Sequence, residues 1–153
     1  MLTITWTECV SASRADHELL SDYRKQKLAR LKDERSRQVS ICAERLLIAA
    51  LREADPAFPL PPEIALEENG KPYLVGRPFE FNVSHSDRYA ACAISDRPVG
   101  LDIQVLSPCS EALVRRFLAP SEQEAVLNAN DRDEVFSKLW CRKESYLQAL
   151  GLG

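Results

Sequence analysis

Long apolar runs are missing from this chain of 153 residues. Its longest aliphatic stretch, Leu46 to Leu51, is far too short to span a bilayer. The N-terminus, MLTITWTE, lacks the basic segment with which a secretory signal peptide begins. These absences predict a protein that is neither secreted nor inserted in a membrane.

Paired cysteine motifs are also missing. The five cysteines are odd in number and widely spaced, and none forms a CxxC pair. This pattern argues against a disulfide framework and against a structural zinc site, and it fits a reducing cytoplasm. The formal net charge of −3 gives no general reason to expect nucleic acid as a partner. The chain is long enough for one globular domain with a real core.

Periodicity predicts mixed secondary structure. Residues from Leu2 to Thr7 alternate between apolar and polar and predict a strand, and Asn69-Gly70 predicts a tight hairpin between two short apolar runs. Ser121 with Glu124 predicts a capping box, and Gly151 stands where a C-cap belongs. Helical spacing of apolar residues is found in five segments: 16–32, 34–54, 110–118, 121–128 and 131–150.

The stretch from Phe81 to Gln104 contains the side chains best suited to bind a ligand or a metal. Its first apolar run ends in Ser84-His85-Ser86, and runs at 89–94 and 99–103 predict two antiparallel strands around a turn. Asp102 and Gln104 would leave the same face of the second strand. Burying a carboxylate is costly unless a cation or hydrogen-bond donors meet it. The stretch therefore predicts a phosphate-binding cluster beside a carboxylate that holds a metal.

Simpler interpretations of these motifs stay open. Hydroxyls at a strand end commonly satisfy turn backbone, and Glu144 with Lys143 fits an ion pair on a solvated helix. The basic run between Arg24 and Arg37 fits a solvated helix face as well as a surface for phosphate or for an acidic partner protein.

The order of the motifs resembles that of the Sfp-type 4′-phosphopantetheinyl transferases, from about Gly70 to the end of the chain. The resemblance implies an α+β fold of two similar halves, in which an antiparallel sheet packs with helices and the active site lies between the halves. On this basis we expect an N-terminal subdomain at 1–106 and an incomplete C-terminal one at 107–153. The motifs, in order, are GKP at 70–72, FNVSHS at 81–86, VGLDI at 99–103, and residues 136–140 leading into KES at 143–145.

The resemblance implies transfer of the phosphopantetheine arm of coenzyme A to a serine of an acyl or peptidyl carrier protein. The family uses Mg²⁺ and releases adenosine 3′,5′-bisphosphate; neither nucleic acid nor a membrane is expected as a partner. Asp102, Glu144 and Gln104 are the implied metal ligands. Glu144, as base for the carrier serine, and Lys143 are the implied catalytic residues. The implied coenzyme A contacts are Lys71, Ser84, His85 and Arg37.

Three features depart from the family pattern. Gln104 stands where the metal-binding strand commonly carries glutamate, and Gln148 stands where lysine is usual. The sequence stops at Gly151-Leu152-Gly153, just inside the expected second half, so we expect either a fragment or a short natural variant. These departures motivate an alternative, a non-catalytic remnant that binds coenzyme A or a carrier protein. A generic Mg²⁺ phosphohydrolase is a more distant alternative, supported only by Asp102 and Glu144.

Overall fold

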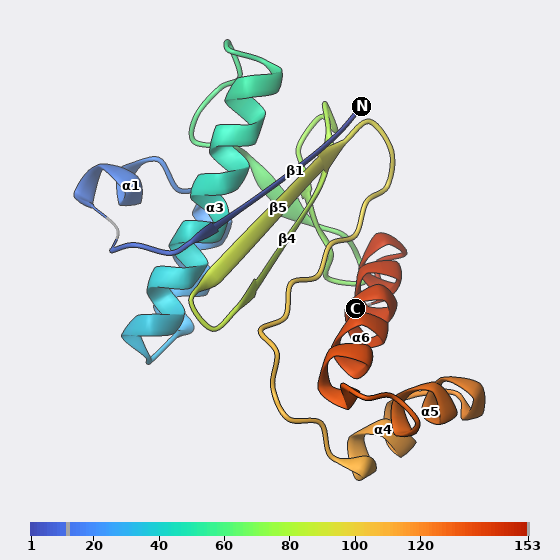
Figure 1. Ribbon diagram of the computed structural model, residues 1–153. Coiled ribbons are helices and arrows are strands. Elements are labelled where there is room, and N and C mark those ends of the chain that lie inside the picture. Colours follow the sequence, from blue (N-terminus) through green and yellow to red (C-terminus); the bar gives the residue numbers. More distant parts are fainter. Residues whose placement is uncertain (12, 153) are drawn as a thin grey trace.

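A three-stranded antiparallel sheet in the order β1–β5–β4 forms the centre of the molecule, and a separate hairpin pairs β2 with β3 (Figure 1). The computed structural model describes residues 1–11 and 13–152. This arrangement confirms the predicted α+β class, with an antiparallel sheet and packed helices. The strands are β1 (Leu2–Glu8), β2 (Ile64–Leu66), β3 (Pro72–Leu74), β4 (Glu80–Ser86) and β5 (Tyr89–Ser95). The helices are α1 (Arg14–Glu18), α2 (Asp22–Arg30), α3 (Glu34–Ala54), α4 (Glu111–Phe117), α5 (Pro120–Leu127) and α6 (Arg132–Ala149).

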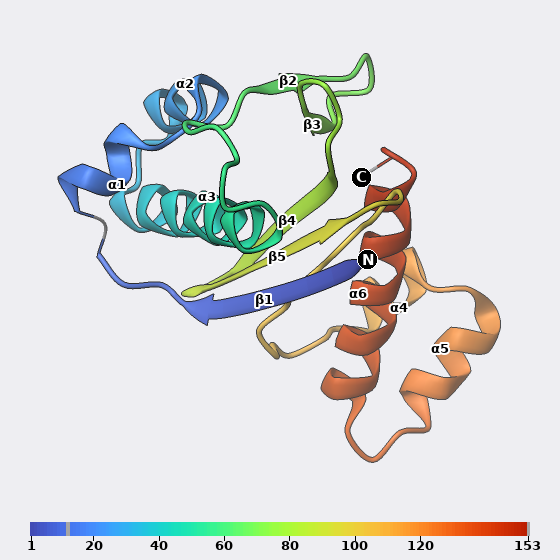
Figure 2. The same cartoon turned by 90° about the horizontal axis from the view of Figure 1, so that it is seen from above.

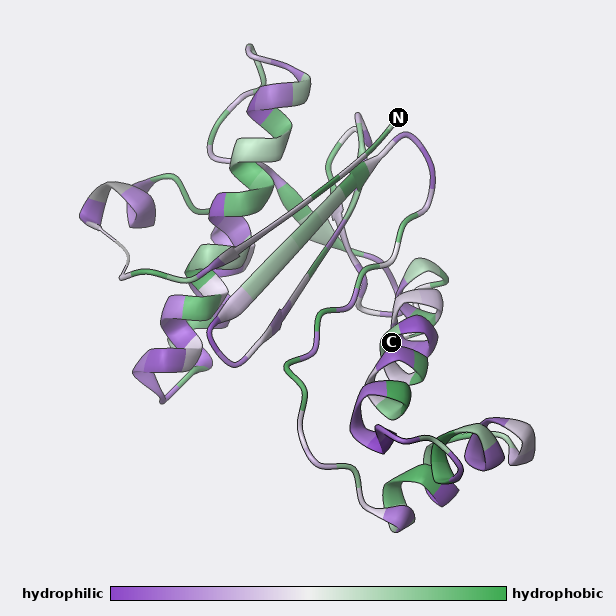
Figure 3. Ribbon diagram, viewed as in Figure 1, coloured by the Kyte–Doolittle hydropathy of each residue, from purple (hydrophilic) through white to green (hydrophobic). Residues whose placement is uncertain are grey.

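The main core lies between α3 and one face of the sheet, whereas α6 lies on the other side of the sheet (Figure 2). Leu47 and Leu51 of α3 pack with Cys92 and Ile94 of β5 and with Phe81 of β4. Strand β5 is hydrophobic along most of its length (Figure 3), as expected for the central strand of the sheet. The helices after β5 share a smaller core built around Val114, Leu118 and Val126.

Several predicted elements are confirmed. The predicted helix at 34–54 matches the bounds of α3, which begins after the N-cap Asp33. Asn69-Gly70 lies in the connection between β2 and β3, where Gly70 takes a φ of +85° that favours glycine. Gly151, with a φ of +71°, follows α6, and the N–H of Leu152 donates to the carbonyl of Leu147. The end of α6 is therefore a glycine C-cap, as predicted.

The prediction of a single helix at 16–32 is wrong, because the chain forms α1 and α2 with a break at residues 19–21. Ser21 caps α2, its side chain accepting from the N–H of Arg24, while its own N–H donates to a buried carboxylate oxygen of Glu44 at 2.6 Å. A long-range contact thus fixes the break. The predicted cap at Ser121 is wrong as well, since Ala119 is the N-cap of α5 and Glu122 accepts its N–H.

Residues 99–103 do not form the predicted second strand; the hairpin partner of β5 is β4. The segment instead runs along the sheet face, bound by side chains of β4. Asn82 Oδ1 accepts the N–H of Leu101, and Ser84 Oγ accepts the N–H of Ile103. Ser86 Oγ accepts the N–H of residue 105 in the same way. Side-chain acceptors thereby replace the backbone ladder that a strand would need.

No helix in the described part of the chain combines the length and the apolar character needed to cross a membrane.

Candidate functional site

Asp102 lies at the centre of the candidate site, held by β4. Its Oδ1 accepts the hydroxyl of Ser84 at 2.8 Å, and Ser84 is buried. Its Oδ2 is buried and has no hydrogen-bond partner among the described residues. An orphaned buried carboxylate oxygen is costly, so it points to a ligand that meets it when the site is filled.

Cys141 and Glu144 of α6 complete the acidic side of the site. The Cys141 thiol lies beside Asp102 and also in the field of Glu144. Burial raises the pKa of Cys141 to about 12, and the Asp102 carboxylate contributes to the rise, so the thiol stays protonated at neutral pH. The structure thus places each of the two carboxylates that the sequence assigned to a metal near Cys141.

The donor set fits Mg²⁺ bound together with a substrate. Among the described residues, no three His, Cys, Asp or Glu side chains gather to hold a metal ion by themselves. Mg²⁺ commonly uses one or two carboxylates plus substrate phosphates rather than a cage made by the protein alone. Asp102 with its free oxygen, and Glu144 nearby, match that pattern.

Gly100 determines how closely the segment that contains Asp102 approaches α6. A Cβ added there would stand 1.8 Å from the carbonyl oxygen of Ser145 and 2.5 Å from the nitrogen of Ala149. Both are backbone atoms, so neither can rotate away. The absence of a side chain at Gly100 is therefore what lets the segment contact the helix that carries Glu144.

A basic pocket of about 230 Å³ lies between α2, the β2–β3 connection, β4 and the end of α6. Arg24, Lys27 and Lys71 supply its positive charges. Lys71 Nζ also donates to the carbonyl of Ala149 at 3.1 Å, which links the pocket to the C-terminal turn of α6. The remaining lining residues are Tyr23, Gly70, Pro72, Asn82, Val83, Gln148 and Gly151.

Arg24 is fixed beneath this pocket by buried partners. Its Nε donates to Glu44 at 2.9 Å, its Nη1 donates to Ser40 at 2.9 Å, and its side chain is only 3% exposed. Removing either partner of such a buried ion pair would leave the other charge uncompensated, and this strongly destabilises the folded state. The interpretation of the basic run as a solvated face is therefore wrong for Arg24.

His85 lies in the field of the same cations. His85 is exposed, but desolvation by its surroundings lowers its pKa below the ordinary value, and the charges of Lys27 and Arg24 lower it further. Burial likewise lowers the pKa of Lys27, with a smaller contribution from Arg24. Basic groups that lie close together and have depressed pKa values are typical of an anion-binding site, because a bound anion relieves the repulsion between their positive charges.

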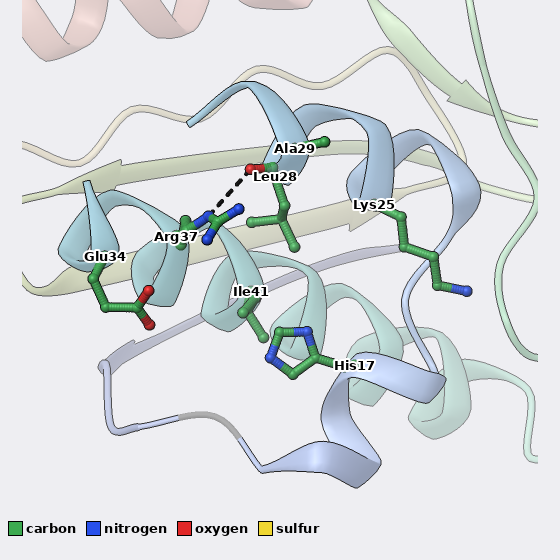
Figure 4. Close-up of a pocket in the computed structure, with 7 residues that line it drawn as sticks. All are labelled: His17, Lys25, Leu28, Ala29, Glu34, Arg37 and Ile41. Atoms are coloured by element: carbon green, nitrogen blue, oxygen red, sulfur yellow. Dashed lines mark hydrogen bonds between the residues drawn. The ribbon is translucent and has the colours of Figure 1, made fainter. Parts of the chain in front are cut away.

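Three predicted site residues lie apart from this group. Arg37 lines a different pocket, between α1, α2 and α3, where its Nε donates to the carbonyl of Leu28 at 3.2 Å (Figure 4). Gln104 is exposed and lines an aromatic pocket with Phe117 and Trp140. Lys143 forms an ion pair with Glu122 of α5 at 2.7 Å.

The other predicted residues gather at the site, together with several that the sequence interpretation did not assign. Lys71 lines the basic pocket, Ser84 holds Asp102, and His85 lies near Lys27. Gln148 lines the pocket, and its Oε1 is buried without a partner among the described residues. Lys27 and Arg24 were visible only as members of a basic run, and Asn82 as the polar residue of an alternating strand.

Comparisons with known proteins agree with this geometry. Residues 98–153 match the family profile of the 4′-phosphopantetheinyl transferase superfamily. The chain is 28% identical over 149 residues to a 4′-phosphopantetheinyl transferase of Bacillus subtilis, covering 94% of this chain and 66% of that protein. It is 38% identical over 91 residues to the transferase Sfp of Bacillus subtilis (strain 168), covering 57% of this chain and 40% of Sfp. It is 40% identical over 96 residues to the Nostoc transferase HetI, covering 57% of this chain and 40% of HetI.

The profile match includes the segment that contains Asp102, Cys141 and Glu144. The chain spans two fifths to two thirds of the relatives' length. The predicted resemblance is thus confirmed: the chain is similar to Sfp-type 4′-phosphopantetheinyl transferases over part of their length.

Proposed function

We propose that the chain belongs to an enzyme that transfers the 4′-phosphopantetheine group of coenzyme A to a serine of an acyl or peptidyl carrier protein, in the cytoplasm. The observation that carries the proposal is the adjacency of a basic pocket and a pair of carboxylates, joined through α6. Coenzyme A carries phosphate groups, which the basic pocket would bind, and a diphosphate, which would lie next to the carboxylates. The released product is then adenosine 3′,5′-bisphosphate.

Each group has a role that its surroundings support. Lys27 and Lys71 bind phosphate oxygens, and Arg24, through its buried pair with Glu44, holds α2 in place beneath them. Asp102 and Glu144 hold Mg²⁺, which when bound neutralises charge that develops on the diphosphate. Glu144 is also the base that takes the proton of the carrier serine, because a hydroxyl is a weak nucleophile until it is deprotonated. Ser84 orients Asp102 through its hydrogen bond.

Binding without transfer is the second candidate. It is favoured by Gln148, which lines the pocket at the position where the family usually carries lysine and whose Oε1 is buried without a partner among the described residues. A neutral amide makes weaker hydrogen bonds to phosphate than an ammonium group does. Gln104, turned toward a different pocket, adds no anionic ligand to the metal.

Intact-mass analysis distinguishes the two candidates. The full-length protein, coenzyme A, Mg²⁺ and an apo carrier protein are incubated together, with the EDTA-treated reaction as control. Transfer predicts a phosphopantetheine-sized mass gain on the carrier that is lost with EDTA. Coenzyme A binding without any mass gain, over several acyl and peptidyl carriers, would favour the binding protein.

The depressed pKa of His85 predicts proton uptake when coenzyme A binds. In the free protein the imidazole is neutral at pH 7, because desolvation and then Lys27 and Arg24 oppose its protonation. A phosphate placed among these cations reverses the sign of the local field and raises the pKa of His85. We therefore expect coenzyme A affinity to increase severalfold between about pH 7.5 and about pH 6, the range in which a histidine relieved of this repulsion becomes protonated.

Calorimetry in two buffers of different ionisation enthalpy, at one pH near about 6.5, measures this uptake. The matched variant is His85→Gln, which keeps a hydrogen-bonding side chain but does not titrate. Its uptake should be smaller than that of the natural protein by a large fraction of one proton. Equal uptake in both proteins would show that His85 does not face the phosphates.

A further inference from the structure

Two thiols meet where β1 ends against α3. Cys9 directly follows β1, and Cys42 lies in the middle of α3. Cys42 is buried in a small cluster with Ala43 and Ala90, and Cys9 packs against this cluster. The two thiols lie beside each other in this cluster. Two neighbouring thiols can bind one thiophilic group together.

The pair can be reached from solvent on the side of Cys9. Cys9 is only partly buried, and its neighbour Val10 is 65% exposed. A cavity of about 230 Å³ opens onto Cys42 between β1 and α3. Thr7, Glu8, Val10, Arg45, Leu46 and Ala49 line the cavity with it. A small reagent can therefore reach the partly buried Cys9 thiol from solvent and the Cys42 thiol through the cavity.

We propose that Cys9 and Cys42 form a dithiol site that closes to an intramolecular disulfide by exchange with a small-molecule disulfide such as oxidised glutathione. The Cys9 thiolate attacks one sulfur of glutathione disulfide, and the first glutathione thiolate leaves. The Cys42 thiolate then attacks the Cys9 sulfur of the mixed disulfide, and the second glutathione thiolate leaves. Two protein thiols are oxidised, one glutathione disulfide is reduced, and the two protons pass to the leaving thiolates.

The surroundings of Cys9 slow this exchange at neutral pH. Burial, with the Cys42 contact, raises the pKa of Cys9 to about 12; Glu8 raises it slightly and Arg45 lowers it. The thiolate is the reactive form, so the rate should rise as the pH increases from about 7 to about 9. Closure would join β1 to α3 around the segment that contains α1 and α2, and with them Arg24 and Lys27 of the basic pocket.

The test is peptide mapping of the native full-length protein after incubation with oxidised glutathione at about pH 8, where more of the thiol is ionised. The expected product has lost two hydrogens and contains a crosslink, cleaved by dithiothreitol, between tryptic peptides 1–14 and 38–45, which carry Cys9 and Cys42. It should melt at a temperature higher by roughly 5–10 °C, a gain that dithiothreitol reverses. A glutathione adduct on Cys9 that never resolves, or a crosslink between other cysteines, would overturn the proposal.

Phenylarsine oxide gives a second measurement that needs no oxidation. The arsenic atom condenses with two neighbouring thiols and releases one water. We expect one equivalent to bind the natural protein and to be removed by a small dithiol, but not by a monothiol. Cys9→Ser and Cys42→Ser should each lose this binding, while Cys141→Ser, the matched control, should keep it. Unchanged binding in either of the first two variants would show that the thiols do not act as a pair.

Discussion

Asp102→Asn is expected to lower kcat/KM for phosphopantetheine transfer by at least about 10³-fold, equivalent to roughly 4 kcal/mol of transition-state stabilisation. Asparagine keeps the shape of the side chain and can still accept the Ser84 hydroxyl, so the position of the segment is retained. It removes the negative charge of the carboxylate, whose Oδ2 is buried without a hydrogen-bond partner among the described residues. Glu144→Gln should cause a similar loss, because it removes both a metal carboxylate and the proposed base.

The same change should not destabilise the protein. A carboxylate with a buried, unpartnered oxygen costs free energy of folding, and an amide carries no charge to desolvate. We expect the melting temperature of Asp102→Asn, measured without metal, to be unchanged or raised by a few degrees. Mg²⁺ should raise the melting temperature of the natural protein in the presence of coenzyme A and have little effect on the variant.

Gln104→Ala is the control for this pair of variants. Gln104 is exposed and lines the aromatic pocket beside Phe117, so its removal should change the Mg²⁺ requirement by less than about threefold. A large loss of Mg²⁺ affinity in Gln104→Ala, with little loss in Asp102→Asn, would reverse the proposed assignment of ligands.

Local signals predicted the parts of the fold that local chemistry determines. Helix α3 has a cap at Asp33, an uninterrupted apolar stripe and no Gly or Pro before Pro56, so its bounds follow from periodicity alone. The Asn69-Gly70 hairpin depends on a positive φ that glycine adopts at little cost, and it too was predicted correctly.

Long-range contacts decide the elements that were predicted wrongly. The break between α1 and α2 depends on Glu44, which accepts the N–H of Ser21 from 23 positions away. The run at 99–103 alternates as a strand does, but its N–H groups meet side chains of β4 rather than a backbone ladder. Period-2 alternation indicates an extended chain and does not distinguish these two kinds of partner.

In the candidate site too, local motifs predicted some residues and long-range contacts place the others. Asp102 and Glu144 were recognised because they belong to motifs, and the structure places both beside Cys141. Lys27 was not assigned because a basic run carries no information on which of its members will face β4. Its position depends on how α2 docks, and that docking is fixed by the buried pair of Arg24 with Glu44.

Gly100→Ala should cause the largest loss of stability among single changes near the site. In most positions that are compatible with alanine, this substitution stabilises a protein by about 0.4–1 kcal/mol, because it restricts the unfolded chain. Here the added methyl group would stand 1.8 Å from one backbone atom of α6 and 2.5 Å from another. The segment and the helix must move apart, so we expect a loss on the order of 4 kcal/mol or more and no measurable transfer.

Gly76→Ala is the matched control, because Gly76 has a φ of +79° and no atom within 4 Å of an added Cβ. The change costs only the strain of a left-handed backbone, about 1–2 kcal/mol, and should keep the activity. Hydrogen exchange locates the effect of Gly100→Ala: protection should fall in α6 and residues 99–103 while α3 stays protected. If Gly100→Ala melts within a degree of the natural protein and remains active, Gly100 does not set the distance between Asp102 and Glu144.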